Sequence, residues 1–228
     1  MKLKAVIFDF DGTLFDSMSI WETLGEDYLR TKGIHAGADL PDRLKTLSLY
    51  EAAVLFQQEY DIRLDAQTIM GELNGMIEMA YREEVRPKAG AEELVRELNR
   101  RSIACGIATA TDRFLIEAAL MRCGMIGLFE GIFTCSEAGS GKDRPDVYRE
   151  AAKGLGADRR CTVIFEDALH AAKTAKRDGF ITIAVYDAYE EHQAELKELC
   201  DGYLTDLSDT GHIVDMIRKL TAGDGIEG

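Results

Sequence analysis

The amino-acid sequence predicts an α/β fold, in which a parallel sheet is flanked by helices and a helical segment is inserted early in the chain. Through the second part of the chain, short apolar runs alternate with helical patterns, as in βαβ units. Another apolar run, Ala5–Phe8, stands alone near the amino terminus. Between the two lies a block whose apolar residues recur at helical spacing. We therefore assign all the apolar runs to one sheet, which the helical block interrupts.

The inserted block is predicted to contain four helices. Asp16 or Ser17 is the expected N-cap of the first. The other three are predicted over Ala38–Lys45, Ser48–Tyr60 and Asp65–Glu84. We accordingly assign residues 16–84 to an inserted helical cap domain, and residues 1–15 and 85–228 to the core.

The alternating part of the chain, beyond Gly90, supplies the rest of the core. Its helices are predicted over Ala91–Arg101, Arg113–Cys123, Asp146–Gly154 and Ala168–Asp178. Its strands are predicted over Ile103–Ala108, Gly131–Cys135, Thr162–Phe165 and Ile181–Val185. In a sheet built from such units the strands run parallel, so that their carboxyl ends meet at one edge, where ligands bind. Polar residues that follow several of these strands are therefore expected to share one site.

Composition indicates a soluble globular protein that does not bind polyanions. The 228 residues carry a net charge of −14, which repels nucleic acid and anionic membrane surfaces. A small phosphorylated metabolite stays compatible as a partner, because a metal ion and one lysine can reverse the local field inside a cleft. A monomer is the default expectation.

Targeting and cysteine patterns favour a cytoplasmic location. No long apolar span is present, and the run Ala5–Phe8 is too short for a signal peptide. The five cysteines are odd in number, widely spaced and without a Cys-x-x-Cys pair. Free thiols in a reducing compartment are therefore expected rather than disulfides or a zinc site.

Asp9 and Asp11 directly follow Ala5–Phe8, at the carboxyl end of a predicted buried strand. In a continuing strand, acids at i and i+2 would face the same way and repel each other, so a divalent cation is the simplest compensation. Gly12 then allows a sharp turn and lets backbone amides approach a ligand. An EF-hand calcium loop is disfavoured because the motif runs into Leu14. The arrangement suits a carboxylate nucleophile, a carboxylate for proton transfer and a hard metal.

Two further strand ends carry groups that suit a phosphate. Thr109 and Ala110 offer a hydroxyl and backbone amides at the start of a helix, which is a ready anion site. Lys142 lies in a glycine-rich turn and is interpreted as a single cation for phosphate. Asp143 stands where a P-loop has serine or threonine, so that motif is not met. Taken alone, a strand threonine and a loop lysine are ordinary features.

Glu166 and Asp167 follow the predicted strand Thr162–Phe165. An acidic helix start is the ordinary explanation, since carboxylates favour the positive end of the helix dipole. Together with Asp9 and Asp11, however, these acids supply the oxygen ligands that Mg²⁺ requires. The sequence therefore predicts a Mg²⁺ site shared by two strand ends.

On these residues the chain resembles the haloacid dehalogenase-like hydrolase superfamily, in its helical-cap group of phosphatases and β-phosphoglucomutase-like enzymes. Four signature regions occur in the family's order, at Asp9–Ser17, Thr109, Lys142–Asp146 and Phe165–Asp167. The resemblance covers the core nearly end to end and is weaker over the cap. It implies a Rossmann-like three-layer core with a parallel sheet of five or six strands. An inserted helical domain beside a catalytic loop is well placed to be a lid.

The resemblance also implies a role for each acid. Asp9 would be the nucleophile that forms an aspartyl-phosphate. Asp11 would protonate the leaving oxygen and then activate the hydrolytic water. Asp9, Asp167 and the backbone carbonyl of Asp11 would hold Mg²⁺, with Glu166 beside the metal or a metal-bound water.

For the phosphoryl group, the resemblance implies contacts to Thr109 and Lys142, and backbone amides of Ala110 and Gly12 complete the expected phosphate site. The acid Asp11 disfavours haloacid dehalogenases and phosphonoacetaldehyde hydrolases, which lack an acid at this position. We expect a Mg²⁺-dependent phosphatase that hydrolyses a small organic phosphate monoester, such as a sugar phosphate or phosphoglycolate, through an aspartyl-phosphate.

Two alternatives stay open. A β-phosphoglucomutase-like mutase shares all four motifs, but that family typically carries a cap histidine and an arginine where the best-matching positions here are Trp21 and Leu49. A non-catalytic member that senses a ligand or binds a protein would be free to lose Asp9 or Lys142, and both are present.

Four further side chains have two interpretations each. Trp21, Tyr28 and Tyr50 could line a substrate pocket, although packing in the cap core is the favoured interpretation. His170 follows the acidic pair closely and is expected on a helix surface rather than near a leaving group.

Overall fold

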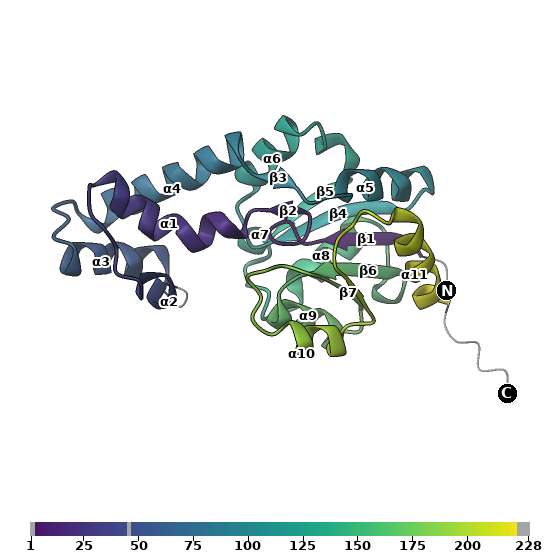
Figure 1. Cartoon of the computed structure of the whole chain (residues 1–228). Coiled ribbons are helices and arrows are strands. Elements are labelled where there is room, and N and C mark those ends of the chain that lie inside the picture. The colour runs from purple at the N-terminus through teal and green to yellow at the C-terminus, as the bar shows by residue number, and fades with distance from the viewer. Residues whose placement is uncertain (1–2, 45–46, 223–228) are drawn as a thin grey trace. The chain divides into compact units, whose positions relative to one another are not determined.

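The computed structural model describes residues 3–44 and 47–222 and divides the chain into two compact units. The core unit comprises Met1–Asp16 and Arg86–Gly228, and the cap unit is Ser17–Val85 (Figure 1). The whole helical block of the sequence thus forms a unit of its own between two segments of the core.

Six parallel strands form the sheet of the core unit, in the order β5-β4-β1-β6-β7-β8 (Figure 1). They are β1 (Ala5–Phe8), β4 (Ala104–Thr109), β5 (Gly131–Thr134), β6 (Thr162–Glu166), β7 (Ile181–Val185) and β8 (Gly202–Leu204). The chain builds outward from β1 to β5 and then crosses to β6 on the other side of β1. The strand order therefore reverses between β1 and β6, which is where open α/β sheets form a crevice at their carboxyl ends.

Strand β1 is buried on both faces, as its continuous apolar run predicts. Its four residues are fully buried. Ala5 and Ile7 pack in one cluster with Val147 and Ala151 of helix α8 (Asp146–Gly154). Because successive strand residues point to opposite faces, Val6 and Phe8 fill the other side of the sheet. A central parallel strand of this kind holds its carboxyl end rigidly in place.

The other helices of the core unit flank this sheet. They are α5 (Ala91–Arg100), α6 (Arg113–Arg122), α7 (Cys135–Ala138), α9 (Leu169–Arg177), α10 (Gln193–Leu199) and α11 (Thr210–Ala222), with 3₁₀ turns at Ile126–Leu128 and Arg159–Cys161. The four core helices and four strands predicted beyond Gly90 are confirmed to within one residue at each end. The Rossmann-like three-layer α/β core is therefore confirmed, with six strands.

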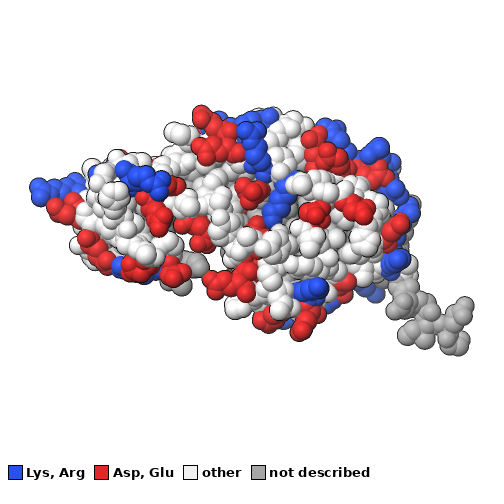
Figure 2. All heavy atoms as spheres, in the orientation of Figure 1, with Lys and Arg blue, Asp and Glu red and all other residues white. Residues whose placement is uncertain are grey.

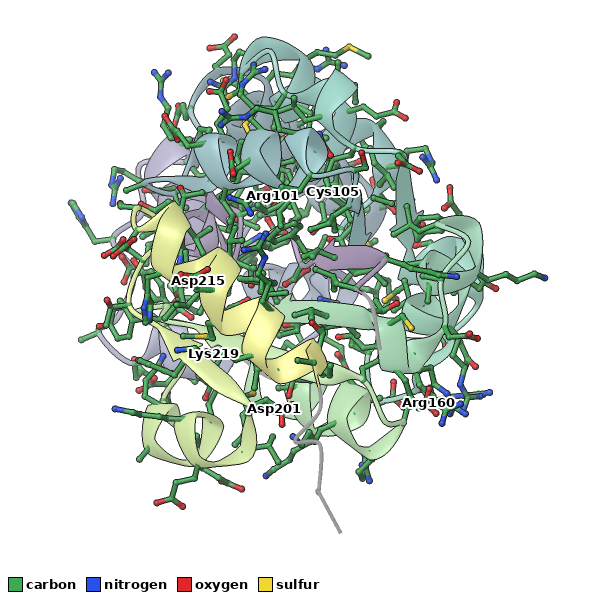
Figure 3. The ribbon with its side chains drawn as sticks, turned by 90° about the vertical axis from the view of Figure 1, so that its right-hand side faces the viewer. Arg101, Cys105, Arg160, Asp201, Asp215 and Lys219 are labelled. Atoms are coloured by element: carbon green, nitrogen blue, oxygen red, sulfur yellow. The ribbon has the colours of Figure 1, made fainter. Side chains whose placement is uncertain are left out.

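The last part of the core carries elements that the sequence analysis did not assign. Helix α10, strand β8 and helix α11 all lie beyond Val185. Helix α11 is amphipathic: Ile213 and Ile217 are buried, whereas Asp215 and Lys219 are exposed and are labelled in Figure 3. It packs against α5.

The chain leaves and re-enters the core unit through two short paired strands. β2 (Phe15–Asp16) and β3 (Arg86–Pro87) form an antiparallel pair in which Phe15 lies opposite Pro87. The Lys88 amide then donates a hydrogen bond to the Leu14 carbonyl at 2.8 Å. The two connections to the cap unit are therefore held side by side, and both belong to the loop system that follows β1.

The cap unit consists of helices α1 (Met18–Thr31), α2 (Leu40–Leu44), α3 (Leu49–Glu59) and α4 (Ala66–Glu83). Helix α1 begins after Ser17, one of the two predicted N-caps. Ser48 caps α3 in a capping box with Glu51. Helix α2 begins at Leu40, two residues later than predicted, and Lys45, its predicted last residue, lies outside the described residues.

Acidic side chains are spread over the visible face and interspersed with lysine and arginine (Figure 2). Within the described parts of the chain, none of the helices is both long and apolar enough to cross a bilayer. On this face the negative charge is thus distributed rather than gathered in one block.

Candidate active site

Asp9 sits at the carboxyl end of β1 and is almost completely buried. Its amide donates a hydrogen bond to the Phe165 carbonyl at 2.9 Å, which continues the pairing between β1 and β6 by one residue. The chain then turns at Gly12, where φ is +75°. Amides of Leu14 and Phe15 close the turn on the Phe10 carbonyl. This tight loop fixes the nucleophile candidate at the point where the strand order reverses.

Lys142 reaches into the same place from the loop between α7 and α8. Its Nζ lies 2.6 Å from Asp9 Oδ1, and it also forms an ion pair with Glu166. All three side chains are buried. The sequence prediction assigned Lys142 to phosphate binding; the structure places its ammonium directly beside the carboxylate expected to receive the phosphoryl group.

Glu166 and Asp167 complete the cluster at the end of β6. Glu166 Oε1 accepts hydrogen bonds from Lys142 and from the Tyr148 hydroxyl, the latter at 2.7 Å. Asp167 Oδ1 accepts one from the Thr13 hydroxyl at 2.8 Å. The second oxygen of Glu166, Oε2, is buried and has no hydrogen-bond partner among the described residues. A buried carboxylate oxygen without a partner is costly unless a cation meets it.

The protonation equilibria reflect this crowding of acids. Burial raises the pKa of the Asp9 carboxyl well above its ordinary value, although the Lys142 ammonium opposes the shift. Burial, and then the charge of Glu166, raise the pKa of Asp167 to about 7. Burial alone would lower the pKa of Lys142, but the Asp9 and Glu166 carboxylates outweigh burial and raise it. Burial and mutual repulsion therefore disfavour full ionisation of the acids, and Lys142 alone does not offset these effects.

The cluster fits a hard divalent cation. Asp9, Glu166 and Asp167 each offer a carboxylate oxygen, and these atoms lie within 4.8 Å of one another. With Lys142 protonated, the ionised cluster carries a net charge of −2, which one divalent ion balances. Carboxylate oxygens are the ligands that Mg²⁺ prefers. Both the donor set and the unpartnered Glu166 Oε2 match such an ion.

Asp11 points to a different partner. Asp11 is half-buried, and its Oδ2 accepts a hydrogen bond from the Thr111 hydroxyl at 2.6 Å. The Thr111 amide in turn donates to Thr109 Oγ1 at 3.0 Å. Thr109 is fully buried and Ala110 is exposed. The structure thus brings the second acid together with the end of β4, the strand end predicted to bind phosphate.

Three hydroxyl donors of the site had no role in the sequence analysis: Thr13, Thr111 and Tyr148. Thr13 stands inside the first motif and Thr111 next to the predicted phosphate site, so a search for donors close to the acids would have found both. Tyr148 lies 18 residues from its partner Glu166 and looks like an ordinary apolar position of a helix. No sequence signal distinguishes it from a core aromatic.

The remaining predicted side chains divide between core and surface. Tyr28 is buried in the cap core, where its ring stacks on Phe56. This is the interpretation that the sequence favoured. Tyr50 is 56% exposed, so its interpretation as cap core was wrong: it lies on the outer side of α3, one residue into the helix. His170 lies exposed on α9, the more ordinary of its two interpretations.

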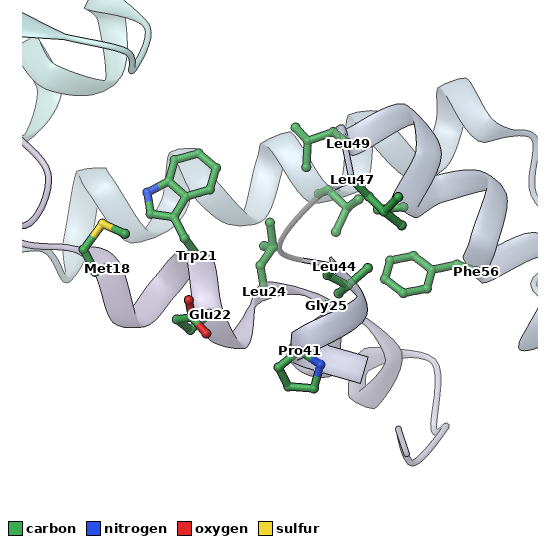
Figure 4. Close-up of a pocket in the computed structure, with 12 residues that line it drawn as sticks. Met18, Trp21, Glu22, Leu24, Gly25, Pro41, Leu44, Leu47, Leu49 and Phe56 are labelled. Carbon is green, nitrogen blue, oxygen red and sulfur yellow. The ribbon is translucent and has the colours of Figure 1, made fainter. Parts of the chain in front are cut away.

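Trp21 lines a cavity of about 330 Å³ that lies wholly within the cap unit (Figure 4). Most of the lining is apolar and includes Leu44, Leu49 and Phe56. Glu22 is the one charged side chain among the described residues that line it. Trp21 therefore borders open space rather than the closed core, contrary to its favoured interpretation.

Comparison with known proteins identifies relatives over most of the chain. Residues 3–179 match the family described as haloacid dehalogenase-like hydrolase. Validoxylamine A 7'-phosphate phosphatase of Streptomyces hygroscopicus subsp. limoneus is 29% identical over 53% of this chain, and the match spans 55% of that protein's length. Hexitol phosphatase B of Escherichia coli (strain K12) is 25% identical over 91% of this chain and 95% of its own.

The fold recurs among solved structures. A candidate β-phosphoglucomutase from Thermotoga maritima has a TM-score of 0.82 at 19% sequence identity, over 93% of this chain and 99% of that chain. At this identity the likeness establishes the fold alone. The matched length is about half of the validoxylamine phosphatase but nearly all of the hexitol phosphatase and of the solved structure.

Proposed function

The chain belongs to the haloacid dehalogenase-like hydrolase family, and from this premise we propose that it is a Mg²⁺-dependent phosphatase acting on a small organic phosphate monoester through an aspartyl-phosphate at Asp9. The observation that carries the proposal is the buried cluster at the ends of β1 and β6. There the Asp9 carboxylate lies 2.6 Å from the Lys142 ammonium, beside two further acids, one with an unpartnered oxygen.

In the first half of the proposed reaction, an oxygen of Asp9 attacks phosphorus and the bond to the leaving oxygen breaks. Asp11 gives its proton to that oxygen, which leaves as an alcohol. Thr111 holds the Asp11 carboxyl in orientation through the hydrogen bond at 2.6 Å. Lys142 offsets negative charge on the phosphoryl oxygens, and Thr109 with the backbone amide of Ala110 offers hydrogen-bond donors for them. The Gly12 amide, which was also expected to bind phosphate, instead donates a hydrogen bond to the Phe15 carbonyl at 2.9 Å.

In the second half, Asp11 takes a proton from a water molecule as the water attacks the phosphorus of the aspartyl-phosphate. Inorganic phosphate leaves and the Asp9 carboxylate is regenerated. Asp9, Glu166, Asp167 and the backbone carbonyl of Asp11 would hold the Mg²⁺. When bound, the ion neutralises charge on the transferring phosphoryl group, the main requirement of phosphoryl transfer.

The names of the relatives support a phosphorylated sugar or sugar-like substrate, since they act on a hexitol phosphate and on validoxylamine A 7'-phosphate. A β-phosphoglucomutase-like mutase is the second candidate, favoured by the shared fold. Against it, Trp21 and Leu49 stand where the mutases have ligand-holding polar residues, and both line the mainly apolar cap cavity. Such a surface is poorly suited to retain a sugar bisphosphate, so hydrolysis is the better-supported reaction.

The test is phosphate release from a panel that contains hexitol phosphates, other sugar phosphates, phosphoglycolate, FMN and glucose 1-phosphate, each with and without Mg²⁺. We expect Mg²⁺-dependent release that Asp9→Asn abolishes. Isomerisation of glucose 1-phosphate without release would favour the mutase. Absence of turnover, together with Mg²⁺ binding by the wild-type protein, would favour a ligand-sensing member.

A further inference from the structure

Tyr148 is a fully buried residue of α8 whose hydroxyl faces the acidic cluster. The ring packs against the sheet in the same cluster as Ile7 and Ile164, and it contacts Phe180 edge-on. The hydroxyl donates a hydrogen bond to Glu166 Oε1 at 2.7 Å. The apolar cluster therefore fixes the position of the ring. The ring in turn fixes the direction of the hydrogen bond that the hydroxyl donates to Glu166.

Glu166 uses its two oxygens unequally. Oε1 accepts from both Tyr148 and Lys142, whereas Oε2 is buried without a hydrogen-bond partner among the described residues. A carboxylate has no internal difference between its oxygens, so the surrounding donors decide which one is engaged. By engaging Oε1, these donors leave Oε2 as the oxygen of Glu166 that is open to a further ligand.

Of the two hydrogen-bond donors to Glu166, Lys142 also has a second partner. Its ammonium also lies 2.6 Å from Asp9, and in the proposed reaction it turns to the phosphoryl oxygens. Tyr148 has no such alternative, because its hydroxyl is buried and Glu166 is the partner that the structure gives it.

We propose that Tyr148 is a positioning residue that holds Glu166 with Oε2 turned toward the cation, and thereby sets the affinity of the site for Mg²⁺. The inference rests on the metal requirement of the proposed function. Groups that hydrogen-bond a metal-binding side chain commonly change metal affinity by about 10- to 100-fold when they are removed. Replacing Tyr148 by phenylalanine removes this hydrogen bond and keeps the ring that fills the core.

The experiment compares Mg²⁺ binding to the full-length wild-type protein and to Tyr148→Phe by calorimetry, with Mg²⁺ alone and no substrate. Tyr28→Phe is the matched control, because Tyr28 is also buried and its hydroxyl donates to a carboxylate, Glu72, at 2.7 Å within the cap unit. We expect Tyr148→Phe to bind Mg²⁺ about tenfold or more weakly and Tyr28→Phe to bind it as the wild type does.

A second measurement separates positioning from general damage to the fold. If Tyr148 acts through the metal site, the Mg²⁺ concentration for half-maximal phosphatase activity rises in Tyr148→Phe, and saturating Mg²⁺ restores kcat. Equal Mg²⁺ affinity in Tyr148→Phe and the wild type would overturn the inference and leave the proposed function standing. Failure of the wild type to bind Mg²⁺ would overturn both.

Discussion

Asp11 carries the proton-transfer step of the proposed reaction, and its carboxyl is held by Thr111 at 2.6 Å. We expect Asp11→Asn to lower kcat by about 10²-fold or more on an alkyl phosphate, because an amide cannot protonate the leaving alkoxide. Because Asp11 also activates the water that attacks the common aspartyl-phosphate, kcat should fall on p-nitrophenyl phosphate as well. The loss in kcat/KM, which reports on phosphorylation of Asp9, should be much smaller with p-nitrophenyl phosphate, whose leaving group needs no proton. Steady-state kinetics on the two substrates check this, and equal losses in kcat/KM would contradict a role in leaving-group protonation.

Asp167 belongs to the acidic cluster and is oriented by the Thr13 hydroxyl. We expect Asp167→Asn to raise the Mg²⁺ concentration required for half-maximal activity, because one anionic ligand is lost while the nucleophile remains. A Mg²⁺ titration of phosphate release measures the change. The control is Asp178→Asn, which removes a half-buried acid at the other end of α9 that pairs with Arg149. An unchanged Mg²⁺ requirement in Asp167→Asn would exclude it as a ligand.

Individual site residues were predictable where they follow strands. Asp9, Glu166, Asp167 and Lys142 could be brought together from sequence because parallel strands end at one edge of a sheet. Their orienting donors could not be identified in this way. Thr13 and Asp167 are 154 positions apart, and Thr111 and Asp11 are 100 apart, so these hydrogen bonds depend on side-chain placement that no local pattern encodes.

The loop that opens α5 depends on a glycine. Gly90 has φ +81° and precedes the helix, and a Cβ atom there would lie 2.2 Å from the Leu207 carbonyl oxygen. We expect Gly90→Ala to destabilise the core unit by at least about 2 kcal/mol, because it adds both backbone strain and a clash with a main-chain atom. Denaturant unfolding followed by circular dichroism measures the free energy.

Gly71, in the middle of α4, is the matched control for this prediction. A Cβ atom at Gly71 meets no atom within 4 Å, and the residue lies in regular helix. Gly71→Ala should therefore stabilise α4 by up to about 1 kcal/mol, since alanine is the better helix former. Similar changes in the free energy of unfolding for the two substitutions would show that neither the positive φ of Gly90 nor its closeness to Leu207 limits stability.

Secondary-structure elements were predictable where the pattern is long and regular. Four helices, α5, α6, α8 and α9, and four strands, β4 to β7, follow alternating apolar runs and amphipathic stretches and were located to within one residue. Helix α7, with four residues, was not predicted. The paired strands β2 and β3 have two residues each, too few for a periodic signal. Strand β8 has three residues, two of them half-buried, so its assignment depends on its pairing with β7.

Taking the molecule as a whole, we predict that substrate binding changes the surroundings of the cap cavity. Trp21 is the only tryptophan of the chain and borders the cap cavity, so its fluorescence reports on that cavity. We expect a phosphorylated substrate to shift or quench the emission of Asp9→Asn, which binds without turnover. Calorimetry on the same sample detects binding independently. Binding without any change in Trp21 emission would contradict participation of the cavity.

The division into two units was visible in the sequence because a helical period replaces the alternating pattern at one place. Which ligand would fit the cap cavity could not be predicted, since the cavity is formed by side chains from four different helices. Substrate choice depends on the shape and polarity of such surfaces, whereas the reaction type depends on the few groups at the strand ends.

The central claim is that Asp9 becomes phosphorylated during turnover. The most direct measurement is mass spectrometry of enzyme mixed with an active substrate and Mg²⁺ and quenched in acid within the first turnover. We predict that the peptide containing Asp9 gains one phosphoryl group and that Asp9→Asn shows neither this adduct nor phosphate release. Phosphate release with an unmodified Asp9 peptide, or turnover by Asp9→Asn, would contradict the mechanism.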